Sequence, residues 1–267
     1  MNWIYFPLYA LLTNILWVIG VILLLMASEK SRNSKAFGNA SLIFSIATLG
    51  LFIVLLWINL ERPPMRTIGE TRLWNSFFIL VVGYIIYLRW GYVWLLFIIL
   101  FLSDIFLVLN YLKPEAHEKT LMPALRSPWF IPHVLTYMLS YSILLVSAIV
   151  AAYGLFRIYF KEQNEKLIGL TDNLVYIGFS LLTLGLLFGA LWAKEAWGNY
   201  WTWDPKETWA FLTWLCYLIY IHFRYFHPAN VKTQFWSLSL IIVVLIVAWF
   251  GINYLPSAQN SVHVYAQ

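Results

Sequence analysis

Hydrophobic residues run along this chain in long stretches, which short polar segments separate. A helix needs about 20 apolar residues to cross a hydrocarbon core of about 30 Å. Eight stretches can be cut to about that length, and they cover residues 4–27, 38–60, 73–89, 91–112, 131–160, 172–193, 207–226 and 234–254. The pattern therefore predicts an all-α integral membrane protein with about eight transmembrane helices.

The order of these stretches divides the chain into two four-span regions. We assign residues 1–112 to an N-terminal region, and residues 113–267 to a second region that carries the residues with recognisable chemistry. The third and fourth stretches are almost continuous, because only Arg89-Trp90-Gly91 separates them. The first stretch has no basic segment before it, so we interpret it as a retained span rather than a cleaved signal peptide.

Composition agrees with a membrane protein and excludes several classes of site. Hydrophobic residues make up 62% and charged residues 11% of the chain, where a soluble domain has about 45–50% and 25%. The basic residues behind the net charge of +5 are scattered through loops, so no nucleic-acid partner is indicated. One cysteine, Cys216, excludes an internal disulfide, a cysteine zinc site and a Cys-x-x-Cys motif.

The loop charges orient the spans only weakly. Cytoplasmic loops usually carry more Lys and Arg than the loops on the other side. In the eight-span arrangement nine such residues fall on one side and eight on the other. The clusters at residues 30–35 and 157–166 favour both termini lying outside the cytoplasm.

Tryptophan is concentrated between the sixth and seventh spans. Eighteen residues contain five tryptophans, interleaved with charged side chains: Trp197, Trp201, Trp203, Trp209 and Trp214. One explanation is an aromatic belt at the membrane surface, but anchoring one helix end needs fewer indoles. A broad aromatic surface with a few charges suits haem, because the macrocycle can stack on indoles while cations or N–H groups bind the propionates.

The residues after Trp203 predict the start of a helix. Pro205 suits a first helical turn, with Asp204 as its N-cap and Glu207 near a capping-box position. Asp204 therefore has two possible roles, a cap or a ligand contact, and both remain open. Trp197 and Trp201 stand four residues apart, so they would share one face if this segment were helical.

Haem iron also needs axial ligands, and neutral imidazole is a common one. His133 opens the fifth span and His263 lies in the C-terminal tail, both on the side of the tryptophan segment. His222 lies near the far end of the seventh span, where an ionisable residue indicates function. A hydrogen-bonded interfacial histidine is the alternative for each. His117 and His227 lie in short loops and are interpreted as solvated.

The run Trp197-Gly-Asn-Tyr-Trp-Thr-Trp-Asp-Pro-Lys-Glu-Thr-Trp209 closely resembles the WWD signature of the CcsA (ResC) family. That family serves System II cytochrome c biogenesis in bacteria and chloroplasts. The resemblance extends from about Ser127 to the C-terminus, and residues 1–110 match only as hydrophobic spans. It implies a multi-pass protein of the cell (inner) membrane, with both termini and the WWD segment, residues 193–214, on the outer (periplasmic) side.

The resemblance also implies roles for particular residues. His133 and His263 are similar to the two external axial ligands of haem iron. His222 resembles a membrane-embedded histidine that takes up haem from the cytoplasmic side. The platform for haem b would consist of Trp197, Trp201, Trp203, Asp204 and Trp209.

The function implied is that the chain binds haem and presents it on the external face. With a ResB/CcsB-type membrane partner it would attach haem covalently to the Cys-x-x-Cys-His motif of apocytochrome c, as the haem-handling subunit of a cytochrome c synthase. The sequence shows no obvious nucleophile or base. This fits a protein that acts as a template by positioning haem for reaction, rather than by nucleophilic or acid–base catalysis. Two other functions remain open: an exporter of haem or a small solute without covalent chemistry, and a structural subunit anchored by its tryptophans.

Overall fold

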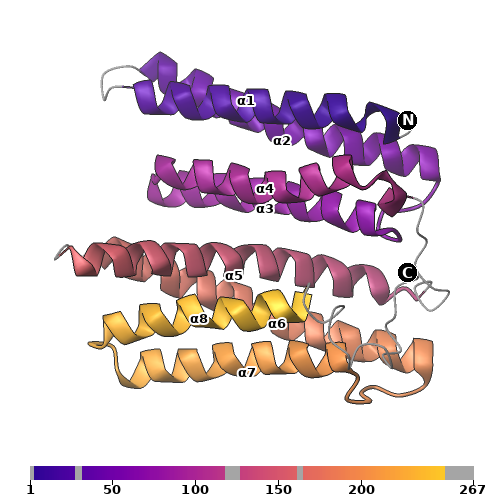
Figure 1. The fold of residues 1–267 in the computed structure, drawn as a ribbon, viewed down its shortest axis with the longest axis vertical. Coiled ribbons are helices and arrows are strands. Elements are labelled where there is room, and N and C mark those ends of the chain that lie inside the picture. Colours follow the sequence, from indigo (N-terminus) through magenta and orange to yellow (C-terminus); the bar gives the residue numbers. More distant parts are fainter. Residues whose placement is uncertain (1–2, 28–31, 118–126, 161–164, 250–267) are drawn as a thin grey trace. The chain divides into compact units, whose positions relative to one another are not determined.

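The computed structural model describes residues 3–27, 32–117, 127–160 and 165–249, and these contain eight long α-helices and no strand (Figure 1). The helices are α1 (Phe6–Met26), α2 (Arg32–Leu60), α3 (Ile68–Trp90), α4 (Val93–Leu112), α5 (Phe130–Tyr159), α6 (Glu165–Trp197), α7 (Pro205–Phe226) and α8 (Val231–Trp249). Two short 3-10 helices, η1 (Trp3–Tyr5) and η2 (Pro114–His117), flank α1 and α4. The predicted all-α class is confirmed, and each predicted span corresponds to one long helix.

Seven of the long helices in the described ranges are long and apolar enough to cross a membrane. The eighth, α7, contains charged and polar side chains, among them Lys206, Glu207, His222 and Arg224. Its 22 residues still measure about 33 Å at 1.5 Å per residue. The length of α7 therefore fits a membrane crossing, although its composition is less apolar than that of the other seven.

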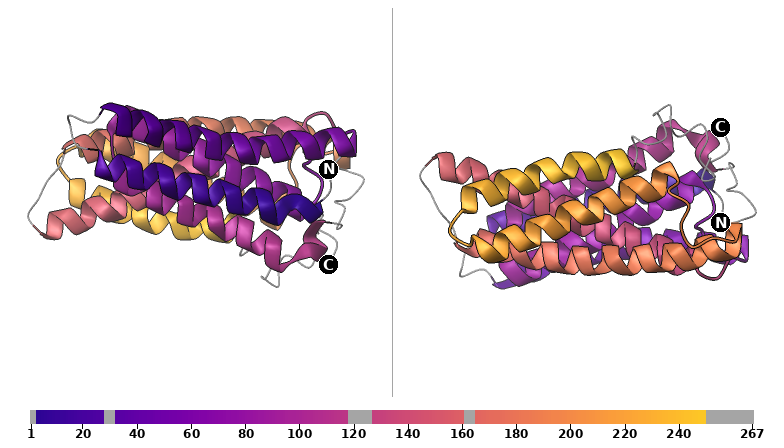
Figure 2. Two further views of the ribbon diagram at one scale, coloured as in Figure 1. Left: turned by 90° about the horizontal axis from the view of Figure 1, so that it is seen from above. Right: turned by 90° about the horizontal axis from the view of Figure 1, so that it is seen from below.

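The chain divides into two compact units, an N-terminal unit (Met1–Leu121) and a C-terminal unit (Met122–Gln267). In the N-terminal unit, α1 and α3 each pack against both α2 and α4. In the C-terminal unit, α5 and α7 each pack against both α6 and α8. Each unit is therefore a four-helix bundle in which the helices run lengthwise beside one another (Figures 1 and 2).

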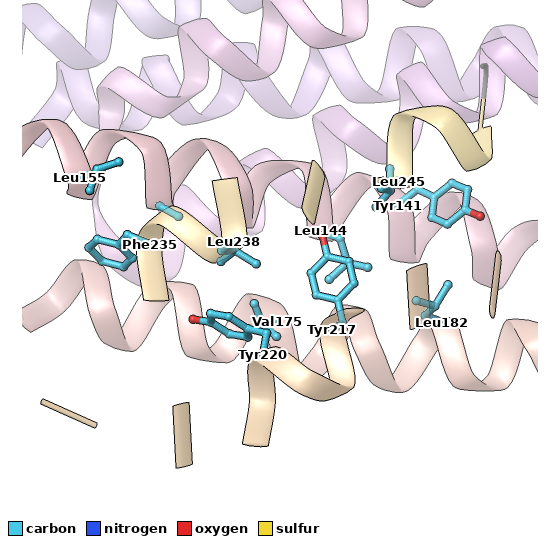
Figure 3. Packing of buried hydrophobic residues seen from close by; sticks show 11 residues of the cluster. Tyr141, Leu144, Leu155, Val175, Leu182, Tyr217, Tyr220, Phe235, Leu238 and Leu245 are labelled. Carbon is cyan, nitrogen blue, oxygen red and sulfur yellow. The ribbon is translucent and has the colours of Figure 1, made fainter. Parts of the chain in front are cut away.

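The core of the C-terminal unit combines aliphatic side chains with buried tyrosines (Figure 3). All four helices contribute to it, through Tyr141, Leu144, Ala151, Leu155, Val175, Leu182, Tyr217, Tyr220, Phe235, Leu238 and Leu245. Lipid tails are as apolar as the aliphatic side chains of this core, so burying these side chains between helices gives no hydrophobic gain. Close van der Waals packing and hydrogen bonds hold such helices together instead. A core of this kind holds the ends of α5, α6 and α7 in place, and those ends carry the candidate site residues.

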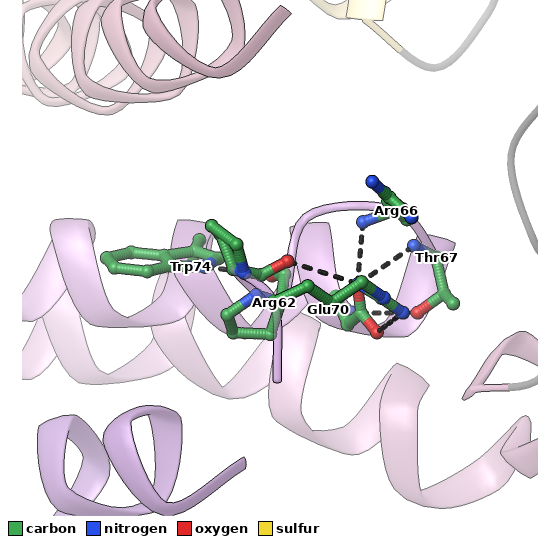
Figure 4. A network of polar contacts seen from close by, with 7 residues as sticks. Arg62, Arg66, Thr67, Glu70 and Trp74 are labelled. Atoms are coloured by element: carbon green, nitrogen blue, oxygen red, sulfur yellow. Dashed lines mark hydrogen bonds and ion pairs between the residues drawn. The ribbon is translucent and has the colours of Figure 1, made fainter. Parts of the chain in front are cut away.

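A buried carboxylate organises the connection between α2 and α3 in the N-terminal unit (Figure 4). Glu70 is 1% exposed and accepts two hydrogen bonds from the Arg62 guanidinium, at 2.9 and 3.0 Å. It also accepts from the backbone N–H groups of Arg66 (2.6 Å) and Thr67 (3.2 Å). The Thr67 side chain in turn accepts from the Glu70 N–H, which completes a capping box at the start of α3.

Gly91 separates the two nearly continuous hydrophobic stretches. It follows the last residue of α3 with φ = 76°, a left-handed conformation that ends helices and favours glycine. Its N–H donates to the Tyr87 carbonyl at 2.8 Å. The third and fourth spans are therefore distinct helices, with their boundary at Gly91.

His117 is not the solvated loop residue expected from the sequence. Its ring stacks on the indole of Trp3, with centroids 3.8 Å apart and planes 7° apart. It also lies against Gly69, where an added Cβ would come within 2.6 Å of the His117 Cδ2. The prediction was wrong because the 3-10 helix η2 places His117 against η1 and α3, which a local charge pattern does not show.

Candidate functional site

His133 lies in the first turn of α5, half-buried against α6. Its Nδ1 atom is 2.8 Å from the Gly185 carbonyl oxygen. A carbonyl oxygen can only accept, so Nδ1 is the nitrogen that carries the proton. In the neutral imidazole Nε2 then holds the lone pair, and a ring held in this way is typical of a metal-ligating histidine. The contact with α6 therefore selects a tautomer that suits iron ligation.

Two glycines on α6 let His133 and its neighbour approach this closely. A Cβ at Gly189 would lie 2.8 Å from Cε1 and 2.9 Å from Nδ1 of His133. A Cβ at Gly185 would clash with the ring of Tyr137, which is one turn beyond His133 on α5. The spacing Gly185-x-x-x-Gly189 is the small-residue pattern that brings membrane helices together. It was present in the sequence and could have indicated this contact.

An indole that the sequence interpretation missed joins His133 to the WWD segment. Trp192 is buried, and its ring stacks on that of His133 with centroids 5.5 Å apart and planes 25° apart. Trp197 meets Trp192 edge-on at 4.7 Å, and Phe130 lies 5.5 Å from Trp192. These four residues, Phe130, His133, Trp192 and Trp197, are called the His133 cluster. Trp192 shares a helix face with Gly185 and Gly189, and this spacing in the sequence could have indicated that Trp192 lies beside His133.

Three of the four remaining tryptophans of the WWD segment form a second group. Trp201, Trp203, Phe211 and Trp214, here the Trp201 cluster, have successive ring centroids 5.8 to 6.3 Å apart. Because α6 ends at Trp197, Trp197 and Trp201 do not share a helical face. The predicted platform is thus two clusters rather than one continuous face. Half-buried Trp209, in the first turns of α7, belongs to neither.

Trp203 is the most exposed indole of the Trp201 cluster, with 65% of its surface accessible. Its φ angle is 59°, in the left-handed region that residues other than glycine rarely adopt. The Thr208 hydroxyl donates to the Trp203 carbonyl at 3.2 Å and helps to hold this conformation. Backbone strain of this kind is concentrated at functional sites, and here it turns an apolar ring outward.

Asp204 and Glu207 form the predicted capping box at the start of α7. Asp204 Oδ1 accepts from the Lys206 N–H at 2.9 Å. Glu207 Oε2 accepts from the Asp204 N–H at 3.2 Å and from the Thr202 N–H at 2.8 Å. The capping role of Asp204 is confirmed, while a direct ligand contact stays a prediction. The box ties the loop of the WWD segment to α7, which determines where the Trp201 cluster lies.

The polar groups beside these rings suit an acidic ligand edge. Burial lowers the pKa of the Lys206 ammonium to about 8, and nearby Asp204 opposes this by favouring the charged form. The Trp201 Nε1–H is buried and has no acceptor within the described part of the chain. Lys194 is engaged differently, because it donates to the Gly198 carbonyl at 2.8 Å and lies over the Tyr200 ring. A cation and an indole N–H therefore accompany the aromatic surfaces.

His222 is remote from the His133 cluster. It lies 18 residues beyond Asp204 along α7, which is about 27 Å of helix. Its ring is exposed, and its Nδ1 is 2.8 Å from the Leu218 carbonyl oxygen, so Nε2 again holds the lone pair. An open apolar pocket surrounds it, lined by Leu218, Ile219, His222, Phe223, Phe226 and His227. His227 is exposed at the end of α7, in agreement with the solvated interpretation.

Two further observations bear on iron ligation. Within the described ranges, no three His, Cys, Asp or Glu side chains form a group that could hold a bare metal ion. Haem iron needs only one or two protein ligands, so single histidines such as His133 or His222 remain suitable. His263, predicted as the second external ligand, lies outside the described residues, and its assignment stays a prediction.

Comparisons with known proteins cover both units. A family model described as "Cytochrome C assembly protein" matches residues 5–258. The "Cytochrome c biogenesis protein CcsA" of Guillardia theta is 30% identical over 87% of each chain. The protein of that name from Mesostigma viride is 29% identical over 87% of this chain and 88% of its own. That of Prochlorococcus marinus (strain MIT 9312) is 37% identical over 54% of this chain and 57% of its own. The similarity therefore extends into α1–α4, beyond the WWD segment.

Proposed function

The chain belongs to the cytochrome c assembly protein family and is a multi-pass membrane protein of cytochrome c biogenesis, and we propose that it binds haem b at the WWD end of the C-terminal unit. With a ResB/CcsB-type membrane partner it presents haem on the outer face of the cell (inner) membrane. There the haem becomes attached to the Cys-x-x-Cys-His motif of apocytochrome c.

The observation that supports this proposal most directly is the setting of His133. Its Nδ1–H donates to a helix carbonyl, its ring stacks on Trp192, and Nε2 holds the lone pair. An iron ligand needs one unprotonated ring nitrogen, and the hydrogen bond to Gly185 leaves Nε2 in that state in the neutral imidazole. We assign His133 as one axial ligand and keep His263 as the proposed second.

The aromatic clusters and their polar edge complete the proposed site. Trp197 of the His133 cluster and the exposed ring of Trp203 offer apolar surfaces for a flat macrocycle. Lys206 and the Trp201 Nε1–H supply a cation and a donor for propionate oxygens. Asp204 contributes by capping α7, which fixes the loop that carries Trp201 and Trp203. His222, at the other end of α7, is proposed to take up haem from the inner leaflet.

Attachment needs no redox step and no protein nucleophile. Each client thiol adds across one haem vinyl group, so that an S–C bond forms and the thiol hydrogen passes to the neighbouring vinyl carbon. The protein supplies proximity by holding the vinyl edge where the client can reach it. The histidine of the client motif then replaces one protein histidine at iron, and the product leaves once the second protein histidine has also dissociated.

The proposal is tested by co-expressing the full chain with a ResB/CcsB-type partner and a reporter apocytochrome c. We expect a haem-stained covalent product that disappears when both client cysteines are replaced by serine. His133→Ala should abolish it. His227→Ala should not, because His227 is exposed and lies outside both clusters. Haem export without any covalent product would overturn the proposal in favour of an exporter.

The absorption spectrum of the purified protein tests the ligand assignment separately. Wild-type protein should carry stoichiometric haem with the narrow bands of low-spin, histidine-ligated iron. His133→Ala should weaken or broaden those bands, because iron loses one strong-field nitrogen. Unchanged bands in His133→Ala would contradict the assignment, and absence of haem from the wild type would favour a purely structural subunit.

A further inference from the structure

Trp214 joins the Trp201 cluster to the neighbouring helix α6. Its Nε1–H donates to the Thr183 hydroxyl oxygen of α6 at 2.9 Å. That hydroxyl donates in turn to the Phe179 carbonyl at 2.9 Å, one turn earlier in the same helix. The indole on α7 is therefore connected, through one side chain, to the backbone of α6. Nothing in the proposed haem chemistry uses Thr183.

Ring stacking extends this connection outward to the tryptophans of the loop. Trp214 stacks on Phe179, with centroids 5.5 Å and planes 27° apart, and on Phe211, with centroids 5.9 Å and planes 17° apart. Phe211 meets Trp201 at 6.3 Å and Trp203 at 6.0 Å, nearly edge-on to both. A displacement of Trp214 would therefore change the support of both loop indoles.

The ring of Trp203 depends on this support because it has few other neighbours. It is 65% exposed, and within the described part of the chain its ring contacts are with Trp201 and Phe211. Its left-handed backbone, with φ = 59°, persists only where the surroundings hold it. The place of this ring is therefore determined by Phe211 and by the residues that hold Phe211.

The same helix α6 also holds the proposed iron ligand. The Gly185 carbonyl lies 2.8 Å from His133 Nδ1, and Trp192 stacks on the His133 ring. Thr183 precedes Trp192 by nine residues, about two and a half turns, so they lie on opposite faces of α6. One face of α6 thus holds His133 and the other holds Trp214. This helix determines where the two clusters lie relative to each other.

We propose that Thr183 is a positioning residue for haem, and that its hydrogen bond to Trp214 holds the rings of Trp201 and Trp203 where they meet the macrocycle. This role rests on the proposed function, because it presupposes haem at these rings. Lipid tails offer an indole N–H no acceptor, so Trp214 loses its partner when Thr183 loses its hydroxyl. A smaller fraction of molecules then holds both rings in the binding position, and haem affinity falls in proportion to that fraction.

A haem titration of the purified full-length chain tests this role with Thr183→Val, which removes the hydroxyl and keeps the shape of the side chain. The dissociation constant for haem should rise about tenfold, the effect of leaving one donor without a partner. The low-spin bands at saturation should not change, because His133 is held on the opposite face of α6. Thr183→Ser keeps an acceptor oxygen and should bind haem as tightly as the wild type.

Thr171→Val is the matched control. Thr171 is buried in the same helix, and its hydroxyl donates to the Leu167 carbonyl at 2.8 Å. This variant repeats the loss of a bond within α6 without affecting α7, so haem affinity should stay near that of the wild type. A second control uses the Trp214→Phe background, which has no N–H to pair. There Thr183→Val should cause no further loss of affinity.

Fluorine NMR of the haem-free protein labelled with fluorotryptophan reports on Trp203 directly. The signal of Trp203, assigned with Trp203→Phe, should shift or split in Thr183→Val and stay in place in Thr171→Val. A lower free energy of unfolding does not by itself move a signal of the folded protein. The measurement therefore separates a positioning role from a general loss of stability.

The positioning role is overturned by an unmoved Trp203 signal in Thr183→Val, by unchanged haem affinity in that variant, or by losses that simply add in the Trp214→Phe background. Failure of the proposed function gives a different result. The wild-type protein then binds no haem at all, while the Trp203 signal still responds to Thr183→Val and not to Thr171→Val.

Discussion

At the scale of single residues, Gly189 determines how closely the ring of His133 approaches α6. Gly189→Ala places a Cβ within 2.9 Å of two His133 ring atoms, and overpacking of this kind costs about 1–3 kcal/mol. The ring must shift and lengthen its bond to the Gly185 carbonyl. We expect weaker haem binding and altered low-spin bands, measured by haem titration and absorption spectroscopy.

Gly169→Ala is the matched control for that prediction. Gly169 lies on the same helix, but an added Cβ meets nothing within 4 Å. Both variants carry the same change in helix propensity, so only the contact with His133 differs. Equal loss of haem binding in the two variants would contradict a positioning role for Gly189.

Lys206 predicts a pH dependence of haem binding. Burial lowers its pKa to about 8, so the side chain is charged below this pH and neutral above it. A charged Lys206 attracts a propionate and a neutral one does not. Haem affinity in titrations should therefore fall as the pH rises from 7 to 9. Lys206→Arg keeps its charge throughout and should flatten the profile, and an equal fall in that variant would exclude Lys206 as the titrating group.

At the scale of elements, the capping box of α7 links the WWD segment to the bundle. Asp204→Ala removes the acceptor of the Lys206 N–H and should cost about 1 kcal/mol. Hydrogen exchange of the backbone amides in the first turn of α7 should accelerate by about fivefold, the equivalent of that free energy. Asp204→Ser preserves a cap and should restore protection. Faster exchange in both variants would point to a role for the carboxylate beyond capping.

The helices themselves were largely predictable from the hydropathy pattern, and their ends were not. Hydropathy indicated a sixth span over 172–193, whereas α6 extends to Trp197. Hydropathy indicates which residues can face lipid. A helix can extend beyond the last of these residues as long as its backbone N–H and C=O groups remain hydrogen-bonded. The break between α3 and α4 depends instead on one local signal, Gly91, whose φ of 76° suits no β-branched or bulky residue.

At the scale of the whole molecule, α7 determines the topology. If it crosses the membrane, the loop around Tyr200 and the loop around Ala229 lie on opposite sides. Single cysteines at these two exposed positions, in a Cys216→Ala background, should react differently with a membrane-impermeant maleimide in intact cells. We expect labelling at position 200 and not at 229 until the membrane is permeabilised. Equal labelling at both would show that α7 does not cross.

The sequence by itself determined the class of protein, the number of long helices, the capping box at Asp204 and the family that the WWD signature indicates. These features are local or periodic, so neighbouring residues suffice to specify them. Tertiary structure decided three features: the Gly185 carbonyl that selects the His133 tautomer, the stacking of Trp192 on His133, and the division of the tryptophans into two clusters. Each depends on the rotation and register of packed helices and on the path of the loop between them, which the whole bundle determines, rather than on residues adjacent in the chain.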